Sequence, residues 1–303
     1  MPSVTVRVPA KINLQLSVGA PKADGYHDIA TVFHAVSLYD EVRASPSDAL
    51  EILVEGDHSD GVPLDASNLA ARAAVALARA AGVPPQARLD IRKGIPVAGG
   101  MAGGSADAAG ALVACDALWG TGFSREQLHA IAAELGSDVP FSLVGGTAVG
   151  LGRGERLTPA LARGRFEWVL ALAGGGLSTP AVYAHCDRMR SGRVLPEPFV
   201  SDALMGALRS GDPAALGRAL SNDLQPAACA LRPALRRTLD AGLDSGALGA
   251  VVSGSGPTCA FLTRSAEHAI DLAVALSGSG TCRTVRRAHG PVPGARVVEG
   301  QGG

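Results

Sequence analysis

The sequence predicts an α+β fold divided between two domains. Segments with strand alternation and segments with helical periodicity follow one another without the regular rhythm of a doubly wound sheet. The 303 residues suit one large domain or two medium ones, and 47% of them are hydrophobic, which is ample for a core. We interpret the glycine- and arginine-rich stretch Gly152–Arg165 as the domain junction, which predicts domains at 1–160 and 161–303.

The first half is expected to begin with strands and to continue with helices. Alternating hydrophobic residues predict strands at Val4–Val8, Ile12–Val18, Leu50–Val54 and Ala87–Ile91, and Asp24-Gly25 is a turn signal. Helical patterns cover Ser67–Ala81, Ser105–Trp119 and Ser124–Leu135. Ser67 or Asn68 can cap the first helix, and Gly82 and Pro84 end it. The third opens with a capping box, because Gln127 follows Ser124 by three positions.

The second half alternates short strands with helices, and no internal repeat is found. The predicted strands are Thr147–Leu151, Trp168–Leu172, Gly249–Val252, Cys259–Leu262 and Cys282–Val285. The predicted helices are Pro180–Met189, Asp202–Ser210, Pro213–Leu220, Pro233–Ala241 and Ala266–Leu276.

Composition excludes several classes of function. A net charge of −1 argues against nucleic acid as the main partner, because binding to the phosphate backbone usually requires a basic excess. No apolar run reaches the roughly 18 residues of a membrane helix, and the N-terminus lacks the apolar core of a signal peptide. We therefore expect a cytoplasmic protein. The five cysteines are scattered and form no C-x-x-C pair, which argues against a disulfide framework and a zinc site.

The strongest functional signal is a glycine-rich loop, P-V-A-G-G-M-A-G-G-S-A-D, at Pro96–Asp107. Its glycines let a ligand approach the backbone, and the helix expected from near Ser105 offers unpaired N–H groups to a phosphate. No lysine follows the glycines, as a Walker loop requires, and the nearest one, Lys93, precedes them. The spacing of dinucleotide-binding loops and the motifs of protein kinases are also missing. The loop therefore predicts a polyphosphate site of another kind.

Four further segments carry polar groups, and each also has a simple structural explanation. Lys11 and Asn13 lie two apart on a predicted strand and so face one way, toward an anion or toward solvent. Only three of the 27 basic residues are lysines, which suggests that a compact charge is needed at Lys11. Asp138 in L-G-S-D-V-P-F is either a general base or a helix N-cap. D-G-Y-H at Asp24–His27 and S-G-S-G-P-T at 253–258 could be ordinary turns.

The order of these five motifs resembles that of the GHMP small-molecule kinases. The resemblance extends from about Pro9 to Thr258. It implies a ribosomal-protein-like N-terminal domain, a ferredoxin-like C-terminal domain and an active site between them. It also implies phosphorylation of a small-molecule alcohol that uses ATP and Mg²⁺. P-A-K-I-N-L and D-G-Y-H point to the subgroup that phosphorylates the 2-hydroxyl of a cytidine diphosphate-linked methylerythritol for non-mevalonate isoprenoid synthesis.

The resemblance also assigns roles to residues. Lys11 and Asp138 match the catalytic pair, in which Asp138 would orient the hydroxyl and take its proton late. Substrate contacts are implied for Asn13, Tyr26, His27, Thr179 and Tyr183, with the two tyrosines on either side of the cytosine. Ser105 would also position the metal. The ATP loop is implied to comprise Pro96, Val97, Ala98, Gly99, Gly100, Met101, Ala102, Gly103, Gly104, Ser105 and Ala106.

Two alternatives remain open from the sequence. Another member of the superfamily, such as a homoserine or mevalonate-type kinase, would share the ATP loop but would not need the aromatic of D-G-Y-H for a nucleobase. A non-catalytic relative that senses nucleotide is disfavoured, because both Lys11 and Asp138 are retained.

Overall fold

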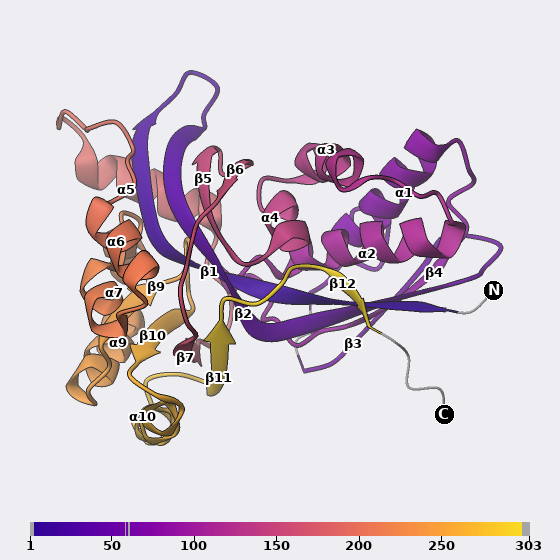
Figure 1. Cartoon of the computed structure of the whole chain (residues 1–303). Helices are drawn as coiled ribbons and strands as arrows, with labels where there is room; N and C mark the ends of the chain where they lie inside the picture. The colour runs from indigo at the N-terminus through magenta and orange to yellow at the C-terminus, as the bar shows by residue number, and fades with distance from the viewer. Residues whose placement is uncertain (1–2, 58, 60, 299–303) are drawn as a thin grey trace.

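The computed structural model describes residues 3–57, 59 and 61–298 and arranges them around two β-sheets (Figure 1). Eight strands form the first sheet, in which β12-β1-β2-β4-β3 is the main path, β5 pairs with β2 and β6, and β8 pairs with β1. Four strands form the second, in the order β11-β7-β10-β9. Together with the helices around them, these sheets confirm the predicted α+β class. No helix among the described residues is long and apolar enough to cross a membrane.

The two longest strands of the first sheet pair with each other in antiparallel orientation. β1 (Val4–Pro21) and β2 (His27–Ser45) pair from Val4↔Ala44 to Pro21↔His27 with three register shifts, and they run along much of the molecule (Figure 1). The sequence predicted β1 as two shorter strands and did not predict β2. The middle of β2 is buried on both faces, so it lacks the polar alternation that marks a half-exposed strand. The remaining strands are β3 (Glu51–Glu55), β4 (Arg88–Arg92), β5 (Thr147–Gly152), β6 (Arg156–Pro159), β8 (Ser221–Asn222) and β12 (Arg296–Val298).

Helices α1 (Leu69–Ala81), α2 (Gly103–Trp119), α3 (Arg125–Leu135) and α4 (Val139–Val144) gather beside this sheet (Figure 1). The Asn68 side chain accepts from the Ala70 N–H and caps α1, and Gly82 ends that helix in the left-handed conformation. The capping box of α3 is present as predicted. α2 begins two residues before the expected start, and α4 was not predicted because a six-residue helix offers little periodicity.

The second sheet contains β7 (Phe166–Leu172), β9 (Gly249–Val252), β10 (Cys259–Thr263) and β11 (Thr284–Gly290). The predicted strand at Cys282–Val285 therefore starts later and extends to Gly290. α8 was not predicted. The helices of this half are α5 (Thr179–Arg190), α6 (Asp202–Ser210), α7 (Pro213–Ala219), α8 (Gln225–Leu231), α9 (Ala234–Asp244) and α10 (Ala266–Gly278).

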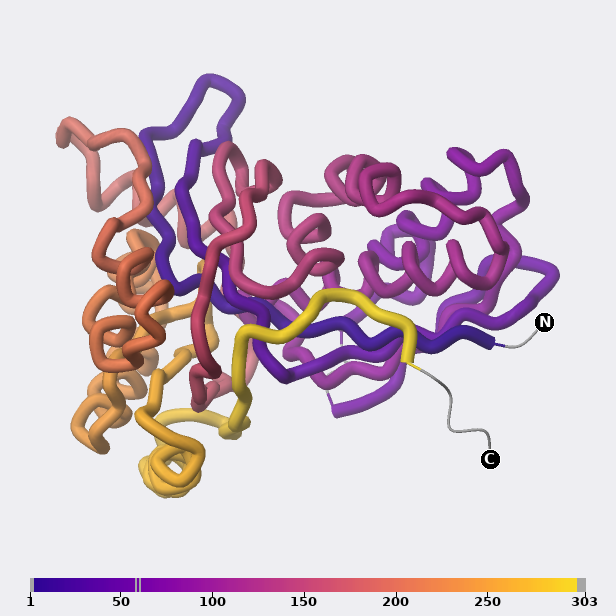
Figure 2. The backbone as a smooth tube through the Cα atoms, in the orientation of Figure 1, coloured from indigo at the N-terminus to yellow at the C-terminus, as the bar shows by residue number. Residues whose placement is uncertain are grey.

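The chain crosses between the sheets within the predicted junction and later returns. β5 and β6 form a hairpin of the first sheet, so the crossing itself lies between Pro159 and Phe166. β8 pairs in parallel with β1, and β12 pairs with the start of β1, where Arg7 faces Arg296. Figure 2 shows the last described residues beside the first strand. A boundary at residue 160 falls in the crossing and stays a proposal.

Candidate active site

One cleft of about 390 Å³ brings together residues from every predicted motif except D-G-Y-H, whose Tyr26 and His27 are not among the lining residues. Lys11 and Asn13 reach it from β1, and Asp138 reaches it from the start of α4. Thr179 and Tyr183 line it from α5. The segments Ala98–Gly100, Ala102–Ser105 and Gly254–Ser255 supply the rest of its polar lining. Segments up to 244 positions apart, from Lys11 to Ser255, therefore share one site.

The glycine-rich loop presents the start of α2 to this cleft. Ala102, at the N-cap position, has φ 59° and makes no side-chain capping bond. The first N–H groups of a helix have no partner within it and carry the positive end of its dipole, so they suit a phosphate. Gly103, Gly104 and Ser105 belong to this first turn and line the cleft.

The late glycine-rich turn holds the loop from behind. The Ser253 hydroxyl donates to the Gly100 carbonyl at 2.9 Å, and the Thr258 N–H donates to the Gly99 carbonyl at 3.3 Å. Gly100 has φ 75°, and a Cβ there would lie 2.1 Å from the Ser253 carbonyl oxygen. Only glycine fits this approach without a backbone shift. S-G-S-G-P-T is thus more than an ordinary turn, because it also contacts the glycine-rich loop and supports its conformation.

Not every residue of the predicted ATP loop faces the cleft. The side chains of Met101 and Ala106 are fully buried in the core. Pro96 and Val97 line a neighbouring cavity of about 240 Å³ together with Pro257. Residues 98–100 and 102–105 are therefore the part of the predicted stretch that lines the cleft.

Lys11 and Asp138 face each other, with Lys11 Nζ 3.7 Å from Asp138 Oδ2. Lys11 is 6% exposed, while the Asp138 side chain keeps 30% of its surface accessible. Asp138 occupies the N-cap position of α4 but makes no capping bond with its side chain. The carboxylate is thus not used as a helix cap and stays accessible to a ligand.

A buried hydrogen-bond chain fixes the position of Lys11. Its Nζ donates to Asn13 Oδ1 at 2.7 Å, and Asn13 Nδ2 donates to the Thr31 hydroxyl at 2.8 Å. Thr31 in turn donates to the Gln15 carbonyl at 2.6 Å. Asn13 thus uses one acceptor site and one donor N–H for protein groups, and because it also lines the cleft its contact with the substrate stays a prediction. Sequence reasoning missed Thr31 because it lies on β2, the strand that was not predicted.

The two ring side chains of the D-G-Y-H turn, Tyr26 and His27, have different surroundings. His27 is 9% exposed, its Nε2 lies 2.9 Å from Asp187 Oδ1, and its ring centroid lies 4.9 Å from that of Tyr183. Burial raises the pKa of the Tyr183 hydroxyl to about 12, so this side chain stays neutral. Tyr26 is 53% exposed and carries the Arg153 guanidinium 3.7 Å from its ring centroid. Placement of a base between Tyr26 and Tyr183 stays a prediction.

The polar lining also fits a magnesium ion brought in by a nucleotide. No group of three or more His, Cys, Asp or Glu side chains in the described part of the chain could hold a metal by itself. Mg²⁺ in phosphoryl-transfer sites usually keeps several waters and uses phosphate oxygens with one or two protein oxygens. Ser105 and Asp138 both line the cleft and offer such oxygens.

A buried ion cluster lies behind the loop. Lys93 Nζ donates to Asp40 and, at 2.7 Å, to Asp107, and Asp40 Oδ1 accepts from the N–H groups of Gly94 and Ile95. Burial, with the negative charge of Asp40 as a second cause, raises the pKa of Asp107 to about 8. A Cβ on Gly103 would lie 3.3 Å from Lys93 Nζ. The cluster therefore joins β2, the entry to the loop and the first turns of α2.

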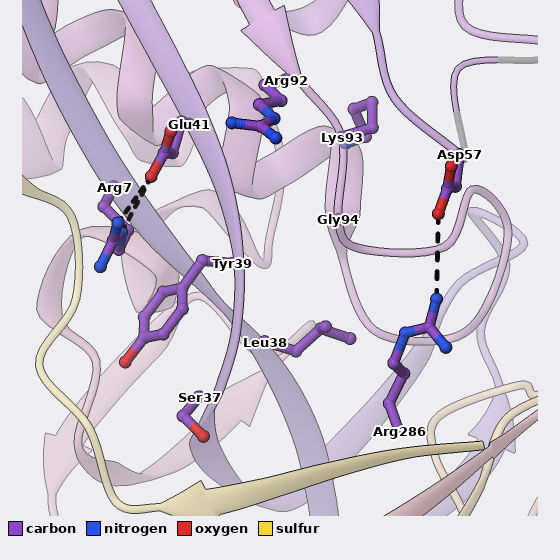
Figure 3. Close-up of a pocket in the computed structure, with 10 residues that line it drawn as sticks. All are labelled: Arg7, Ser37, Leu38, Tyr39, Glu41, Asp57, Arg92, Lys93, Gly94 and Arg286. Atoms are coloured by element: carbon purple, nitrogen blue, oxygen red, sulfur yellow. Dashed lines mark hydrogen bonds and ion pairs between the residues drawn. The ribbon is translucent and has the colours of Figure 1, made fainter.

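A second cavity, of about 470 Å³, is formed around the ends of β2 and β4 (Figure 3). It contains none of the five motifs. Two of its arginines are already paired with carboxylates, Arg7 with Glu41 at 2.7 Å and Arg286 with Asp57 at 3.9 Å (Figure 3). The cleft with Lys11 and Asp138 is therefore the candidate active site.

Comparison with known proteins agrees with this geometry. Models of the GHMP kinases N terminal domain and of the GHMP kinases C terminal match residues 68–146 and 204–282. A 4-diphosphocytidyl-2-C-methyl-D-erythritol kinase from Streptomyces avermitilis is 62% identical over 296 residues, 98% of this chain and 100% of the relative. A crystal structure of 4-(cytidine 5'-diphospho)-2C-methyl-D-erythritol kinase matches with TM-score 0.77 and 33% identity over 94% of this chain and 98% of the other. Homoserine kinase from Cytophaga hutchinsonii shares the fold at 20% identity and TM-score 0.75, with 98% of each chain covered.

Proposed function

The chain belongs to the GHMP kinases, and from this premise we propose that it transfers the γ-phosphoryl group of ATP to the 2-hydroxyl of 4-diphosphocytidyl-2-C-methyl-D-erythritol. This reaction would place it in non-mevalonate isoprenoid precursor synthesis. The observation that carries the proposal is the Lys11–Asp138 pair at 3.7 Å in the same cleft as the open first turn of α2. The 62% identity to a kinase named for this alcohol supports the choice of substrate.

The reaction mainly requires positioning and neutralisation of charge, because phosphoryl transfer passes through a loose transition state. The N–H groups of Gly103, Gly104 and Ser105 would bind phosphate oxygens of ATP. Mg²⁺, when bound with the nucleotide, would neutralise phosphate charge, and the Ser105 hydroxyl is the group of the loop that could hold it.

Asp138 and Lys11 would act on the alcohol. The Asp138 carboxylate accepts a hydrogen bond from the acceptor hydroxyl and takes its proton as the new bond forms, because an aspartate is too weak a base to remove it earlier. Lys11 faces both the carboxylate and the developing negative charge, and the Asn13–Thr31 chain holds its ammonium in place. His27 and Tyr183 pack together and would line the binding site of the base.

The test is ADP release by the purified protein with ATP and Mg²⁺ and one alcohol at a time. We expect turnover with 4-diphosphocytidyl-2-C-methyl-D-erythritol and at least 100-fold lower kcat/KM with homoserine and with mevalonate. Neither of these two alcohols carries a diphosphate or a base, and stacking of a base is worth about 1–3 kcal/mol. Preference for either of these alcohols would overturn the substrate assignment. ATP binding without turnover on any alcohol would indicate the sensing relative.

A further inference from the structure

Arg153 is the second cation of the candidate active site. Among the cleft-lining residues of the described chain, the charged side chains are Lys11, Asp138 and Arg153. Arg153 lies in the turn between β5 and β6, a hairpin that stands beside β1 and β2 (Figure 1). Its backbone N–H donates to Glu155 Oε2 at 2.7 Å. The turn is thus held locally, while the long Arg153 side chain is free to change partners.

The Arg153 side chain has two partners at the mouth of the cleft. Its Nη2 donates to Asp24 Oδ2 at 3.0 Å, and both side chains of this ion pair are half exposed. The guanidinium also covers one face of the Tyr26 ring. An exposed ion pair contributes little, because water screens it. A phosphate offers a guanidinium two parallel charge-assisted hydrogen bonds, so it can replace a single exposed carboxylate oxygen.

The order of groups along the site matches the order of groups along the proposed substrate. In that substrate the diphosphate lies between the base and the alcohol. In the protein, Arg153 contacts Tyr26 of the D-G-Y-H turn and lines the same cleft as Lys11 and Asp138. Lys11 is bonded to Asn13 and faces Asp138, and the first turn of α2 would be occupied by ATP. Arg153 is therefore the cleft-lining cation that is still available to the diphosphate of the alcohol substrate.

We propose that Arg153 binds the diphosphate of the alcohol substrate and leaves Asp24 when it does so. This inference rests on the proposed function and adds a specificity-determining residue to it. The exchange releases one face of the Tyr26 ring, which a cytosine can then use. The protein would thus couple recognition of the base to recognition of the diphosphate, and an alcohol without a diphosphate would leave Arg153 paired with Asp24.

The first test compares Arg153→Met and Arg153→Lys with Arg156→Met, which changes an exposed arginine of the same hairpin. For Arg153→Met we expect the KM for 4-diphosphocytidyl-2-C-methyl-D-erythritol to rise 10- to 100-fold and the KM for ATP to stay within about twofold. Arg153→Lys should recover part of the loss, because it keeps the charge but not the planar fork. Arg156→Met should behave as wild type. A KM for the alcohol within twofold of wild type in Arg153→Met would overturn the inference.

The second test separates binding of the diphosphate from support of Tyr26. Cytidine diphosphate and cytidine are each measured as competitive inhibitors against the alcohol at saturating ATP. Wild type should bind cytidine diphosphate at least tenfold more tightly than cytidine, and Arg153→Met should lose this difference while its inhibition constant for cytidine does not rise above that of wild type. An equal rise of both constants would mean that Arg153 only supports the tyrosine, which contradicts the inference. Failure of the proposed function is distinguishable, since wild type would then not phosphorylate the alcohol at all.

Discussion

Replacement of Lys11 by methionine removes the buried charge that faces Asp138 while keeping much of the side-chain volume. Lys11 Nζ lies 3.7 Å from Asp138 Oδ2, and Lys11 is 6% exposed. When the hydroxyl proton moves to Asp138, the negative charge moves to the substrate oxygen, and Lys11 continues to face it. Because the ammonium is held by Asn13, this stabilisation requires no reorganisation during the reaction.

The distance between Lys11 Nζ and Asp138 Oδ2 sets an upper limit on the expected loss, because only the part of the interaction that is stronger in the transition state than in the ground state lowers kcat. A unit charge pair at this separation interacts by about 1 kcal/mol in water and by about 4.5 kcal/mol at an effective dielectric constant of about 20. At about 1.4 kcal/mol per factor of ten, kcat should fall between about 5-fold and about 1,600-fold. The burial of Lys11 places the expected value in the upper part of this range.

The assay is steady-state ADP release at saturating ATP and alcohol. Lys22→Met is the matched control, because Lys22 is half exposed and pairs with Asp28 outside the cleft, and its kcat should stay within about twofold of wild type. Thermal unfolding of both variants checks that they fold. Lys11→Arg keeps the charge but not the compact shape and should lose less than Lys11→Met. A folded Lys11→Met variant with kcat within threefold of wild type would refute the reasoning.

Three further outcomes follow from the same geometry. Asp138→Asn should lower kcat by about 10²–10⁴-fold, the usual contribution of a general base, with the Kd for ATP nearly unchanged in calorimetry; full activity would exclude Asp138 from the chemistry. Tyr26→Ala should raise the KM for the alcohol by about 5- to 150-fold, as expected from stacking worth about 1–3 kcal/mol, and an equal rise for ATP would argue against stacking. Burial raises the pKa of Asp107 to about 8 in the folded state, compared with about 3.9 in the unfolded chain. Between these two pH values the Asp107 carboxyl is protonated in the folded state and ionised in the unfolded state. The contribution of Asp107 to the free energy of unfolding of wild type therefore falls as pH rises through this window. Asp107→Asn should flatten this slope in urea unfolding from pH 5 to 9, and parallel slopes would show that Asp107 does not cause it.

Much of the fold could be predicted where local signals are strong. The Asn68 cap, the Ser124–Gln127 capping box and the left-handed Gly82 depend on residues within one turn, so the sequence contains the whole interaction. β2 could not be predicted in this way, because its middle is buried on both faces and shows no alternation. β5 was predicted, but β6, its partner in the hairpin, was not, because it lies in the segment Gly152–Arg165, whose glycines and arginines are equally typical of a linker.

In the candidate site, too, local features could be predicted and contacts between distant segments could not. The loop and the same-face placement of Lys11 and Asn13 are local properties, and the structure brings Lys11, Asn13, Asp138, Thr179 and Tyr183 to one cleft with the loop. Thr31, Arg153 and the Asp40–Lys93–Asp107 cluster were missed, because each acts through contacts between distant segments. Lys93 offered a weak signal, as one of three lysines in an arginine-rich chain. Its partners, 53 and 14 positions away, become visible only in the folded protein.

The most direct measurement is the identification of the product. The protein is incubated with ATP labelled in the γ-phosphate, Mg²⁺ and 4-diphosphocytidyl-2-C-methyl-D-erythritol, and the labelled product is located by phosphorus NMR and mass spectrometry. We expect one new phosphate monoester, on the 2-hydroxyl, for each ADP formed, and almost none with Asp138→Asn. Label on another hydroxyl or in free phosphate, or no transfer to this alcohol, would contradict the proposed function.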